Sequence, residues 1–456
     1  MIFLNGWEEV RVMFRKLFLS VVVVISLTVA MPSFAGEFQA IGPEAISMGG
    51  AGVAMARGSF APYYNPALLA EHQNKTEVSL SAGIGLREIS VADSIDNLAD
   101  IDIEDTLNMV RDEILSSWPD PPTLGSDLVD DIKSIRSELS SIPDTNGLQV
   151  MPTVSLGTQI GNFGFGFYGL SEATGHAVVD KDRLDIIIST GNSMIPYVEY
   201  DEERDPSDPL IVSNQTEYEQ RSLQYALENG ETYLNLTGLA YVEVPFAYGH
   251  RFSTKVGTIA LGGALKLMPG YTFEKKIKID TESGDIDDEL KDAEESDLSY
   301  GVDLGVLYKP QKLPRLSIGL VGKNLNTPEF DTTSGATLKV EPQVRAGAAY
   351  DFLNDKVTVA LDADLTKNET FIEDYYAQFI GGGIAYHPVN WFSLRAGAMR
   401  NLQESNDGTI LTAGLGFGMK YLQLDISGQY STEEGEYDGD SFPRCSRIEI
   451  ALVSKW

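Results

Sequence analysis

The sequence has 456 residues, of which 67 are acidic and 34 are basic, so its formal net charge is −33. This acidic excess argues against a nucleic-acid-binding protein, because phosphate contacts require clustered Lys and Arg. Hydrophobic residues make up 43% of the chain and the mean hydropathy is −0.10. The chain is therefore too apolar to be disordered and too polar to be a bundle of transmembrane helices. The single cysteine, Cys445, excludes an intramolecular disulfide and a cysteine-based zinc site, and we expect no metal or cofactor.

Residues 1–35 have the pattern of a secretory signal peptide. Arg15 and Lys16 precede an apolar run over residues 17–31, and small residues ending at Ala35 occupy the positions that a signal peptidase reads. The run is shorter than the roughly 20 residues that a membrane-spanning helix needs, which disfavours a permanent anchor. We predict cleavage after Ala35 and export.

The mature chain alternates apolar and polar residues in many short stretches. In residues 298–309, Leu298, Tyr300 and Val302 fall on one face, while Ser299 and Asp303 fall on the other. This two-residue period predicts β-strands. Fourteen strands are expected, at residues 76–87, 148–159, 162–174, 237–251, 256–268, 297–309, 314–325, 340–352, 355–366, 376–387, 390–401, 408–419, 420–431 and 445–456.

The connections between these strands alternate between short turns and long loops. A soluble β-sandwich also alternates along each strand, but an even strand number with every second loop long is typical of an outer-membrane barrel. We therefore predict an all-β fold, a fourteen-stranded antiparallel transmembrane β-barrel over residues 76–456, in the outer membrane of a Gram-negative-type bacterium. The chain ends would lie on the periplasmic side.

The three longest loops, at residues 88–147, 175–236 and 269–296, contain 38 acidic and 11 basic residues and so carry −27 of the net charge. We expect them on the outer side of the membrane. A solvated surface without a binding role is the favoured interpretation, and bridging to lipopolysaccharide through divalent cations is the alternative.

The first long loop is predicted to contain two helices. Leu107, Val110 and Ile114 recur at helical spacing, as do apolar residues over 124–142, and the prolines at 119–122 separate the two runs. The apolar stripes need a surface to cover them. A lid over the barrel mouth and plain packing between loops are both compatible with this pattern.

The last strand ends on an aromatic residue. Ile448, Ile450, Leu452 and Trp456 share a face, and the chain stops at Trp456. A terminal aromatic residue on a lipid-facing strand is the kind of signal that barrel-assembly machinery recognises, so we predict this role for Trp456.

Residues 36–75 do not alternate, and they contain MGGAGVA at residues 48–54 and YNPALL at residues 64–69. Dense glycines allow close backbone approach, and Asn-Pro favours the start of a short helix, so we predict a compact plug. The two motifs closely resemble the start of FadL-like outer-membrane barrels. The whole mature chain is most similar to the TraF-like family within that group, as in HRFS at 250–253, GLVGKNLNTPEF at 319–330, EPQVRAGAAY at 341–350 and HPVNWFSLRAGAMRN at 387–401.

The resemblance implies an N-terminal hatch that fills the lumen of a monomeric barrel, and a barrel that passes hydrophobic molecules such as long-chain fatty acids. It assigns to the hatch the residues Met48, Gly49, Gly50, Gly52, Arg57, Asn65 and Pro66. In FadL-like barrels a kinked third strand opens a lateral exit. The glycine-rich stretch with Gly164, Gly166 and Gly169 lies in the third predicted strand, so a kink is predicted there.

The sequence does not point to an enzyme. None of its four histidines begins the His-Glu-x-x-His pattern of zinc proteases, and the G-x-G-x-x-G match at residues 164–169 lies in a strand with no helix to follow it. Charged residues on the polar faces of strands are instead candidates for a luminal network, and we expect most of them to be paired. These residues are Arg345, Asp362, Asp364, Arg395, Asp425, Arg447 and Glu449.

Three functions fit these features. A plugged passive transporter would bind a hydrophobic ligand beside the hatch, whereas a non-transporting scaffold of a conjugal transfer or secretion apparatus would use the acidic loops. A surface adhesin would use the same loops. The lumen separates them, because a transporter needs an apolar pocket against the hatch and a scaffold can be packed shut with ion pairs.

Overall fold

The computed structural model describes residues 36–71, 76–120, 124–201, 204, 209–281, 294–418, 421–437 and 440–455. The predicted signal peptide, part of the third long loop and the predicted assembly signal Trp456 lie outside these residues.

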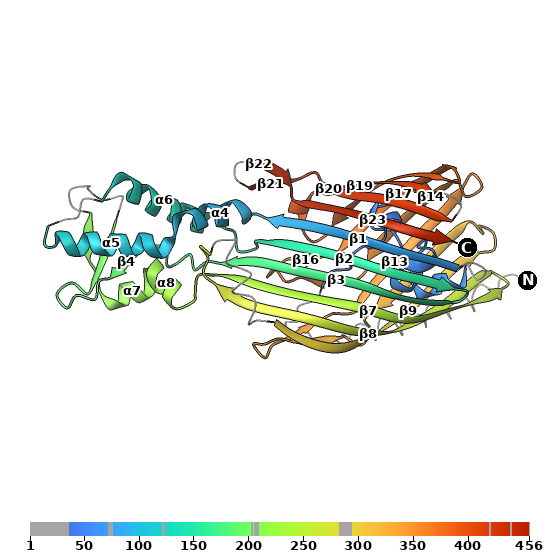
Figure 1. The fold of residues 1–456 in the computed structure, drawn as a ribbon, viewed down its shortest axis with the longest axis horizontal. Coiled ribbons are helices and arrows are strands. Elements are labelled where there is room, and N and C mark those ends of the chain that lie inside the picture. Colours follow the sequence, from blue (N-terminus) through green and yellow to red (C-terminus); the bar gives the residue numbers. More distant parts are fainter. Residues whose placement is uncertain are drawn as a thin grey trace, which may run out of the picture. The chain divides into compact units, whose positions relative to one another are not determined.

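Fourteen antiparallel strands form a closed barrel, and strand β1 closes the ring by pairing with β23 (Figure 1). The prediction of fourteen strands is confirmed. In ring order the strands are β1 (Thr76–Ile89), β2 (Gly147–Ile160), β3 (Phe163–Val178), β7 (Tyr233–Thr254), β8 (Gly257–Ile277), β9 (Glu294–Pro310), β10 (Leu316–Lys323), β13 (Gln343–Phe352), β14 (Val357–Asp364), β17 (Phe379–Val389), β18 (Phe392–Asn401), β19 (Thr409–Gly418), β20 (Leu422–Ser431) and β23 (Cys445–Lys455).

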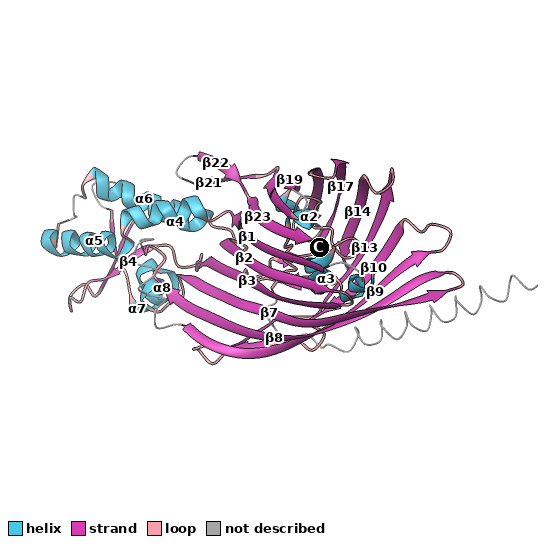
Figure 2. Cartoon of the chain, turned by 45° about the vertical axis from the view of Figure 1, so that its right-hand side comes forward, coloured by secondary structure: helices cyan, strands magenta, loops and turns pink. Residues whose placement is uncertain are grey.

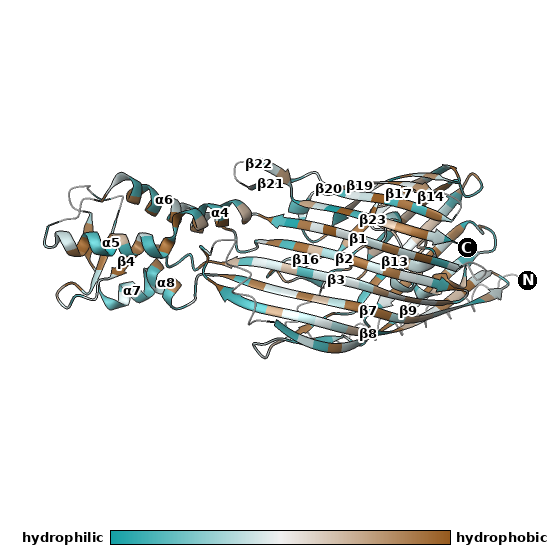
Figure 3. Ribbon diagram, viewed as in Figure 1, coloured by the Kyte–Doolittle hydropathy of each residue, from teal (hydrophilic) through white to brown (hydrophobic). Residues whose placement is uncertain are grey.

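The barrel wall is apolar outside and polar inside. On β9, Leu304 is 57% exposed, whereas the neighbouring Asp303 is 1% exposed. The same alternation of brown and teal runs along the other strands in Figure 3. A water-soluble protein shows the opposite arrangement, whereas a barrel in lipid exposes its apolar face. The outward apolar positions of β9 extend from Leu298 to Tyr308, which is 11 residues and matches the roughly 9–11 that a membrane-spanning strand needs.

Residues 36–71, which we call the luminal segment, lie inside the barrel (Figure 2). They form the short helices α2 (Pro43–Ile46), η1 (Gly58–Phe60), α3 (Ala61–Tyr64) and η2 (Pro66–Ala70). Proline stands in the first turn of α2, α3 and η2, where its missing N–H costs nothing. The side chain of Asn65 accepts a hydrogen bond from the Ala67 N–H, which caps η2.

Two long loops combine into a second folded region, which we call the loop domain. The first loop contributes α4 (Ala92–Ile101), α5 (Ile103–Ser117) and α6 (Ser126–Ser141), and the second contributes β4 (Ile186–Ser189), β5 (Tyr197–Tyr200), β6 (Leu210–Val212), α7 (Gln215–Arg221) and α8 (Leu223–Glu228). The two helices predicted in the first loop are α5 and α6, and α4 is an additional one. Their buried apolar residues form one core with β4, β5 and the ends of β7 and β8. The predicted stripes are therefore covered by the second loop.

The remaining loops form short hairpins at the same end of the barrel. These are β11 (Glu329–Asp331) with β12 (Thr337–Lys339), β15 (Asn368–Glu369) with β16 (Tyr376–Ala377), and β21 (Glu434–Tyr437) with β22 (Asp440–Pro443), and η3 (Ser405–Asp407) lies between β18 and β19. Across the described part of the chain, the helices are all too short or too polar to span a membrane.

Candidate functional site

The luminal segment contacts the wall mainly through backbone groups that bond to inward-facing side chains. The Gly42 N–H donates to Glu449 Oε1 at 2.7 Å, and the Gly49 N–H donates to Thr412 Oγ1 at 3.0 Å. The Ser59 hydroxyl bonds Ser79 at 2.7 Å. Such contacts satisfy buried backbone donors that the short helices leave unpaired.

The predicted hatch residues take different roles in this packing. Met48 is fully buried, and Asn65 donates to the carbonyl oxygens of Val53 and Val306, at 3.0 and 3.2 Å. Pro66 begins η2, next to the wall. Arg57 is 42% exposed and lies 3.6 Å from Asp351, so it is at the edge of the luminal network.

Gly49 shows how closely the luminal segment approaches the wall. Its φ is +67°, and an added Cβ would lie 2.3 Å from the Ala398 carbonyl oxygen and 2.6 Å from the Gly382 nitrogen. Both the backbone angle and the space therefore require glycine. Gly50 also has a positive φ, and at Gly52 a Cβ would meet the Tyr64 ring.

Asp362 on β14 is one anchor of the luminal segment. Its Oδ2 accepts hydrogen bonds from the Gly52 and Val53 N–H groups at 2.7 and 2.9 Å. Arg345 on β13 lies 3.7 Å from this oxygen and 3.4 Å from Asp364, whose Oδ2 accepts from the Phe379 N–H.

All seven predicted luminal charges lie on the inner face of the wall. Arg395 and Asp425 form an ion pair at 2.6 Å, and Arg447 donates to Thr153 at 3.1 Å. Glu449 accepts from the luminal segment, as described above. The predicted residues therefore fall into three places around the ring, at β13–β14, β18–β20 and β23.

A second charge cluster was not predicted from the sequence. Lys266 on β8 is fully buried and bonds Glu243 at 2.8 Å and Asp303 at 3.0 Å. Lys323 lies 3.5 Å from Glu243, and its Nζ is 3.3 Å from the centroid of the Tyr63 ring. Glu243, Lys266 and Asp303 each alternate with apolar residues along the strand, which is the signal that could have identified them.

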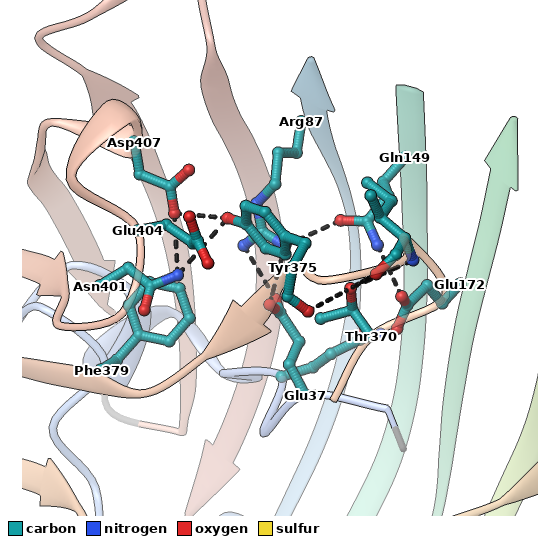
Figure 4. Close-up of polar contacts among 12 residues, drawn as sticks. Glu37, Arg87, Gln149, Glu172, Thr370, Tyr375, Phe379, Asn401, Glu404 and Asp407 are labelled. Atoms are coloured by element: carbon teal, nitrogen blue, oxygen red, sulfur yellow. Dashed lines mark hydrogen bonds and ion pairs between the residues drawn. The ribbon is translucent and has the colours of Figure 1, made fainter. Parts of the chain in front are cut away.

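A third polar network, also missed, joins the luminal segment to the loop end of the lumen (Figure 4). Glu37 accepts from both Nη atoms of Arg87, at 2.8 and 3.3 Å. Arg87 also donates to Gln149 at 2.8 Å, and Gln149 donates to Glu172 at 2.7 Å. The Tyr375 ring lies 5.3 Å from the Arg87 guanidinium.

Tyr375 continues this network toward the loops, where its hydroxyl donates to Asp407 at 2.5 Å. Asn401 donates to the same carboxylate oxygen at 3.0 Å. Burial raises the pKa of Tyr375 well above its usual value, so its hydroxyl remains a donor at neutral pH. Burial also raises the pKa of Glu404, which accepts from the Tyr376 N–H in the adjoining loop.

The glycines of β3 have a packing role that the sequence interpretation did not include. An added Cβ at Gly164 would lie 2.3 Å from Pro62, and one at Gly166 would meet the Tyr168 ring. Residues 164–169 stay paired with β2 throughout. Toward β7 the ladder lacks pairs at Gly166 and Phe167, which lie opposite Pro245 and Val244 respectively, and it keeps the same register on both sides. Pro245 has no N–H to donate, which accounts for the interruption.

A small cavity of about 40 Å³ lies where the luminal segment meets the wall. Its lining includes Phe38, Met151, Phe379, Arg345 and Arg447. A larger cavity of about 1010 Å³ lies between α5, α8 and the ends of β7 and β8, and its lining mixes apolar and charged side chains. In the described ranges, no three His, Cys, Asp or Glu side chains are grouped as a metal ion requires.

Comparison with known families identifies the chain. The family model described as "F plasmid transfer operon, TraF, protein" matches residues 62–364. The chain belongs to this family. No curated protein matches the sequence.

Solved structures with similarity to this TraF-family barrel include two from Pseudomonas. The toluene transporter TodX of P. putida aligns at 12% identity over 92% of this chain and 98% of the transporter, with a TM-score of 0.46. A FadL homologue of Pseudomonas aeruginosa aligns at 11% identity over 93% of this chain and 98% of that one, with a TM-score of 0.44. The fourteen-stranded closed barrel follows from the strand pairing of this chain itself.

Proposed function

We propose that the chain is an outer-membrane barrel that passes small hydrophobic molecules passively, with the luminal segment as its hatch. The observation that carries this proposal is that residues 36–71 fill the lumen through hydrogen bonds, ion pairs and apolar contacts with the wall. Such contacts hold a segment in place and can be exchanged when it moves. The apolar outer face supports a location in the outer membrane, reached through export by the predicted signal peptide.

The geometry described above corresponds to a closed state. The cavity beside the hatch, at about 40 Å³, is far below the 300–1,000 Å³ typical of ligand pockets. Passage of a ligand therefore requires the hatch to move, or the wall to part where the β3–β7 ladder is interrupted. We propose the lateral exit at this interruption, between β3 and β7.

Two disulfides provide a matched test of hatch movement. In a Cys445→Ser background, Ser59→Cys with Ser79→Cys would link the hatch to β1, because the two hydroxyl oxygens are 2.7 Å apart. Ser81→Cys with Ser155→Cys is the control, because these oxygens are 2.8 Å apart and both residues belong to the wall.

The readout is uptake of toluene and of a long-chain fatty acid by cells that carry each variant. We expect the Ser59–Ser79 disulfide to abolish uptake, a reductant to restore it, and the Ser81–Ser155 disulfide to leave it unchanged. Equal uptake with the hatch locked and unlocked would exclude hatch movement. The absence of uptake by the unmodified barrel would exclude transport of these probes.

A scaffold role in conjugal transfer or secretion is the second candidate, and the loop domain favours it. That domain has an aliphatic core, which it shares with the ends of β3, β7 and β8, and its loops are acidic, which suits a folded surface module. The adhesin alternative would use the same module. Deletion of residues 92–141 and 186–228, each replaced by a short Gly-Ser linker, should leave uptake intact if the barrel transports, and should abolish assembly with partners if it is a scaffold.

The remaining expectations on partners belong to the same proposal. Lipid would contact the apolar outer face, barrel-assembly machinery would bind β23, and the barrel would act as a monomer. Chemical crosslinking of the barrel in native membranes tests the monomer, because a second copy would produce a band at twice the mass.

A further inference from the structure

The first residues of the luminal segment are fixed to the wall at the loop end of the lumen. The Gly36 carbonyl oxygen accepts a hydrogen bond from the side-chain amide of Gln343 at 2.7 Å. The next residue, Glu37, forms the ion pair with Arg87 described above. Gly36 is half-buried, and the predicted cleavage after Ala35 would make it the first residue of the mature chain. The α-amino group of that chain would therefore lie inside the barrel.

Glu172 on β3 faces this position. It is 3% exposed, and a Cβ added at Gly36 would have Glu172 Oε2 at 3.8 Å as its one contact within 4 Å among the described residues beyond its chain neighbours. The Gly36 nitrogen is about 2.5 Å from that Cβ position, so it lies no more than about 6.5 Å from Oε2. Gln149 donates to the other oxygen at 2.7 Å, and the Phe371 N–H approaches the same carboxyl (Figure 4). Within the described part of the chain, Oε2 has no hydrogen-bond partner.

The charges around Glu172 do not balance. Glu37 and Arg87 are the charged groups whose field acts on it, so two carboxylates face one guanidinium and the three groups together carry −1. Arg345, which lines the cavity beside Glu37, lies 3.4 Å from a carboxylate of its own, Asp364. A carboxylate removed from water is costly unless a positive charge accompanies it. Water could fill a hydrogen-bonding position on Oε2, but it would not supply that charge.

We propose that Glu172 binds the α-ammonium group of Gly36, which forms only when the signal peptide is removed. Before cleavage, the Gly36 nitrogen belongs to a peptide bond and is a neutral donor of one hydrogen. Hydrolysis of the Ala35–Gly36 bond consumes one water, leaves a carboxylate on Ala35 and gives Gly36 an ammonium group with three hydrogens and a positive charge.

That ammonium group would give Oε2 its donor and bring the charge of the Glu37, Arg87 and Glu172 groups to zero. Removal of the signal peptide would then complete the seating of the luminal segment in the lumen. The proposal rests on the predicted cleavage site, and it does not require that the barrel transports anything.

The first test is the chemical reactivity of the Gly36 amine in the exported barrel, purified in detergent. Formaldehyde with cyanoborohydride methylates unprotonated amines, and mass spectrometry of the N-terminal peptide measures the extent. We expect the chain to begin at Gly36. We also expect its amine to react at least about tenfold more slowly in the folded barrel than in urea, because an adjacent carboxylate favours the protonated amine.

Two variants locate this protection. Glu172→Gln removes the negative charge and should raise the methylation rate of the Gly36 amine in the folded barrel about tenfold. Glu88→Gln is the matched control, because Glu88 is also a buried carboxylate with one unpartnered oxygen, and that oxygen faces Gly435. Its methylation rate should equal that of the wild type.

A one-residue insertion tests the seating without a change at Glu172. An alanine added between Ala35 and Gly36 moves the amine along the chain by about 3.8 Å. The temperature at which the folded barrel band disappears on a gel should fall. Adding Glu172→Gln should lower it no further, because both changes remove the same pair, whereas adding Glu88→Gln should give the sum of two independent effects. The insertion keeps the test available if Glu172→Gln does not fold.

Three results would overturn the proposal. The first is a mature chain that begins at a residue other than Gly36. The second is equal methylation of the Gly36 amine in the wild type and in Glu172→Gln. The third is an insertion that leaves the gel temperature unchanged, or whose effect adds in full to that of Glu172→Gln. Uptake is not among these measurements, so the proposal can fail while transport stands.

Discussion

The luminal segment and the loop domain are both held by buried contacts, but of different kinds. The loop domain has a core of aliphatic side chains from its own helices and strands, such as Ile132, Ile135 and Leu139 of α6. The luminal segment packs its Phe, Tyr and Met side chains against alanines and glycines of the wall, and its backbone donates to wall carboxylates and hydroxyls. The loop-domain core meets the barrel at the ends of β3, β7 and β8, whereas the core around the luminal segment includes wall residues from β3 round to β17.

This difference predicts which of the two regions a core substitution destabilises. The largest loss of stability is expected for a substitution in the loop-domain core. Ile135 is fully buried, so Ile135→Ala should destabilise the loop domain by about 2–5 kcal/mol. Urea unfolding read by Trp118, which packs on this core, measures the loss in a background with Trp391 and Trp456 replaced by Phe. The heat-modifiable mobility of the barrel on a gel should not change.

Lys133→Ala is the control, because Lys133 is exposed on the same helix and should shift neither readout. If Ile135→Ala destabilised the loop domain and also removed the heat-modifiable mobility of the barrel, the two regions would unfold as one unit. The distinction drawn between the two regions would then be wrong.

The next effect concerns the close approach of the luminal segment to the wall. Gly49→Ala and Gly191→Ala introduce a Cβ at the same φ of +67°, which alone costs roughly 1–2 kcal/mol. Gly49 has wall backbone within 2.3–2.7 Å of the new atom, whereas Gly191 has nothing within 4 Å. Gly49→Ala should therefore destabilise by about 1–3 kcal/mol more than Gly191→Ala, from overpacking.

The temperature at which the folded barrel band disappears on a gel measures this difference. We expect it to fall for Gly49→Ala and to stay at the wild-type value for Gly191→Ala, which lies in the loop domain. Equal temperatures for the two variants would show that the luminal segment can withdraw from the wall at no cost.

The strand pattern could be predicted from the sequence because it is local. Period-two alternation identified all fourteen strands, and adjacent strands pair, so Arg345 and Asp364 come opposite one another in the β13–β14 register. The Arg87–Glu37 contact could not be predicted in this way. It depends on how the luminal segment threads through the lumen, and no local periodicity encodes that path.

In the loop domain, too, the sequence predicts the local elements but not their packing partners. Helical spacing predicted α5 and α6, because an apolar stripe is a property of one helix. The partner of that stripe is the second loop, more than 40 residues away along the chain, and the pairing of β2 with β3 brings the two loops together. The packing of Gly164 could not be predicted for a similar reason, because its neighbour Pro62 belongs to the luminal segment and becomes visible only after threading.

A smaller effect tests the charged anchor of the luminal segment. Asp362→Asn keeps an acceptor near the Gly52 and Val53 N–H groups but removes its charge, which should lower the free energy of unfolding of the barrel by about 1–2 kcal/mol. Guanidinium unfolding followed by Trp391 fluorescence measures it. Asp355→Asn, at an exposed turn, should leave the free energy of unfolding unchanged. An equal loss of stability in both variants would mean that Asp362 does not anchor the luminal segment.

The smallest effect is a pH dependence at the loop end of the lumen. Burial raises the pKa of Glu404, so the folded protein favours its protonated form more than the unfolded chain does. Stability should therefore rise slightly as pH falls through this raised pKa toward the ordinary carboxyl value, because the folded state then binds more protons than the unfolded chain.

Glu404→Gln imitates the protonated form and can still accept from the Tyr376 N–H, so it should raise the unfolding midpoint at pH 7.5. The gain should vanish at pH 4, where the wild-type carboxyl is itself protonated in the folded state. Glu436→Gln removes the same charge at an exposed position and controls for net charge. A lower midpoint for Glu404→Gln at pH 7.5 would mean that the ionised carboxylate is stabilising, and that the rim of the lumen resembles the solvated loop domain more than the desolvated interior.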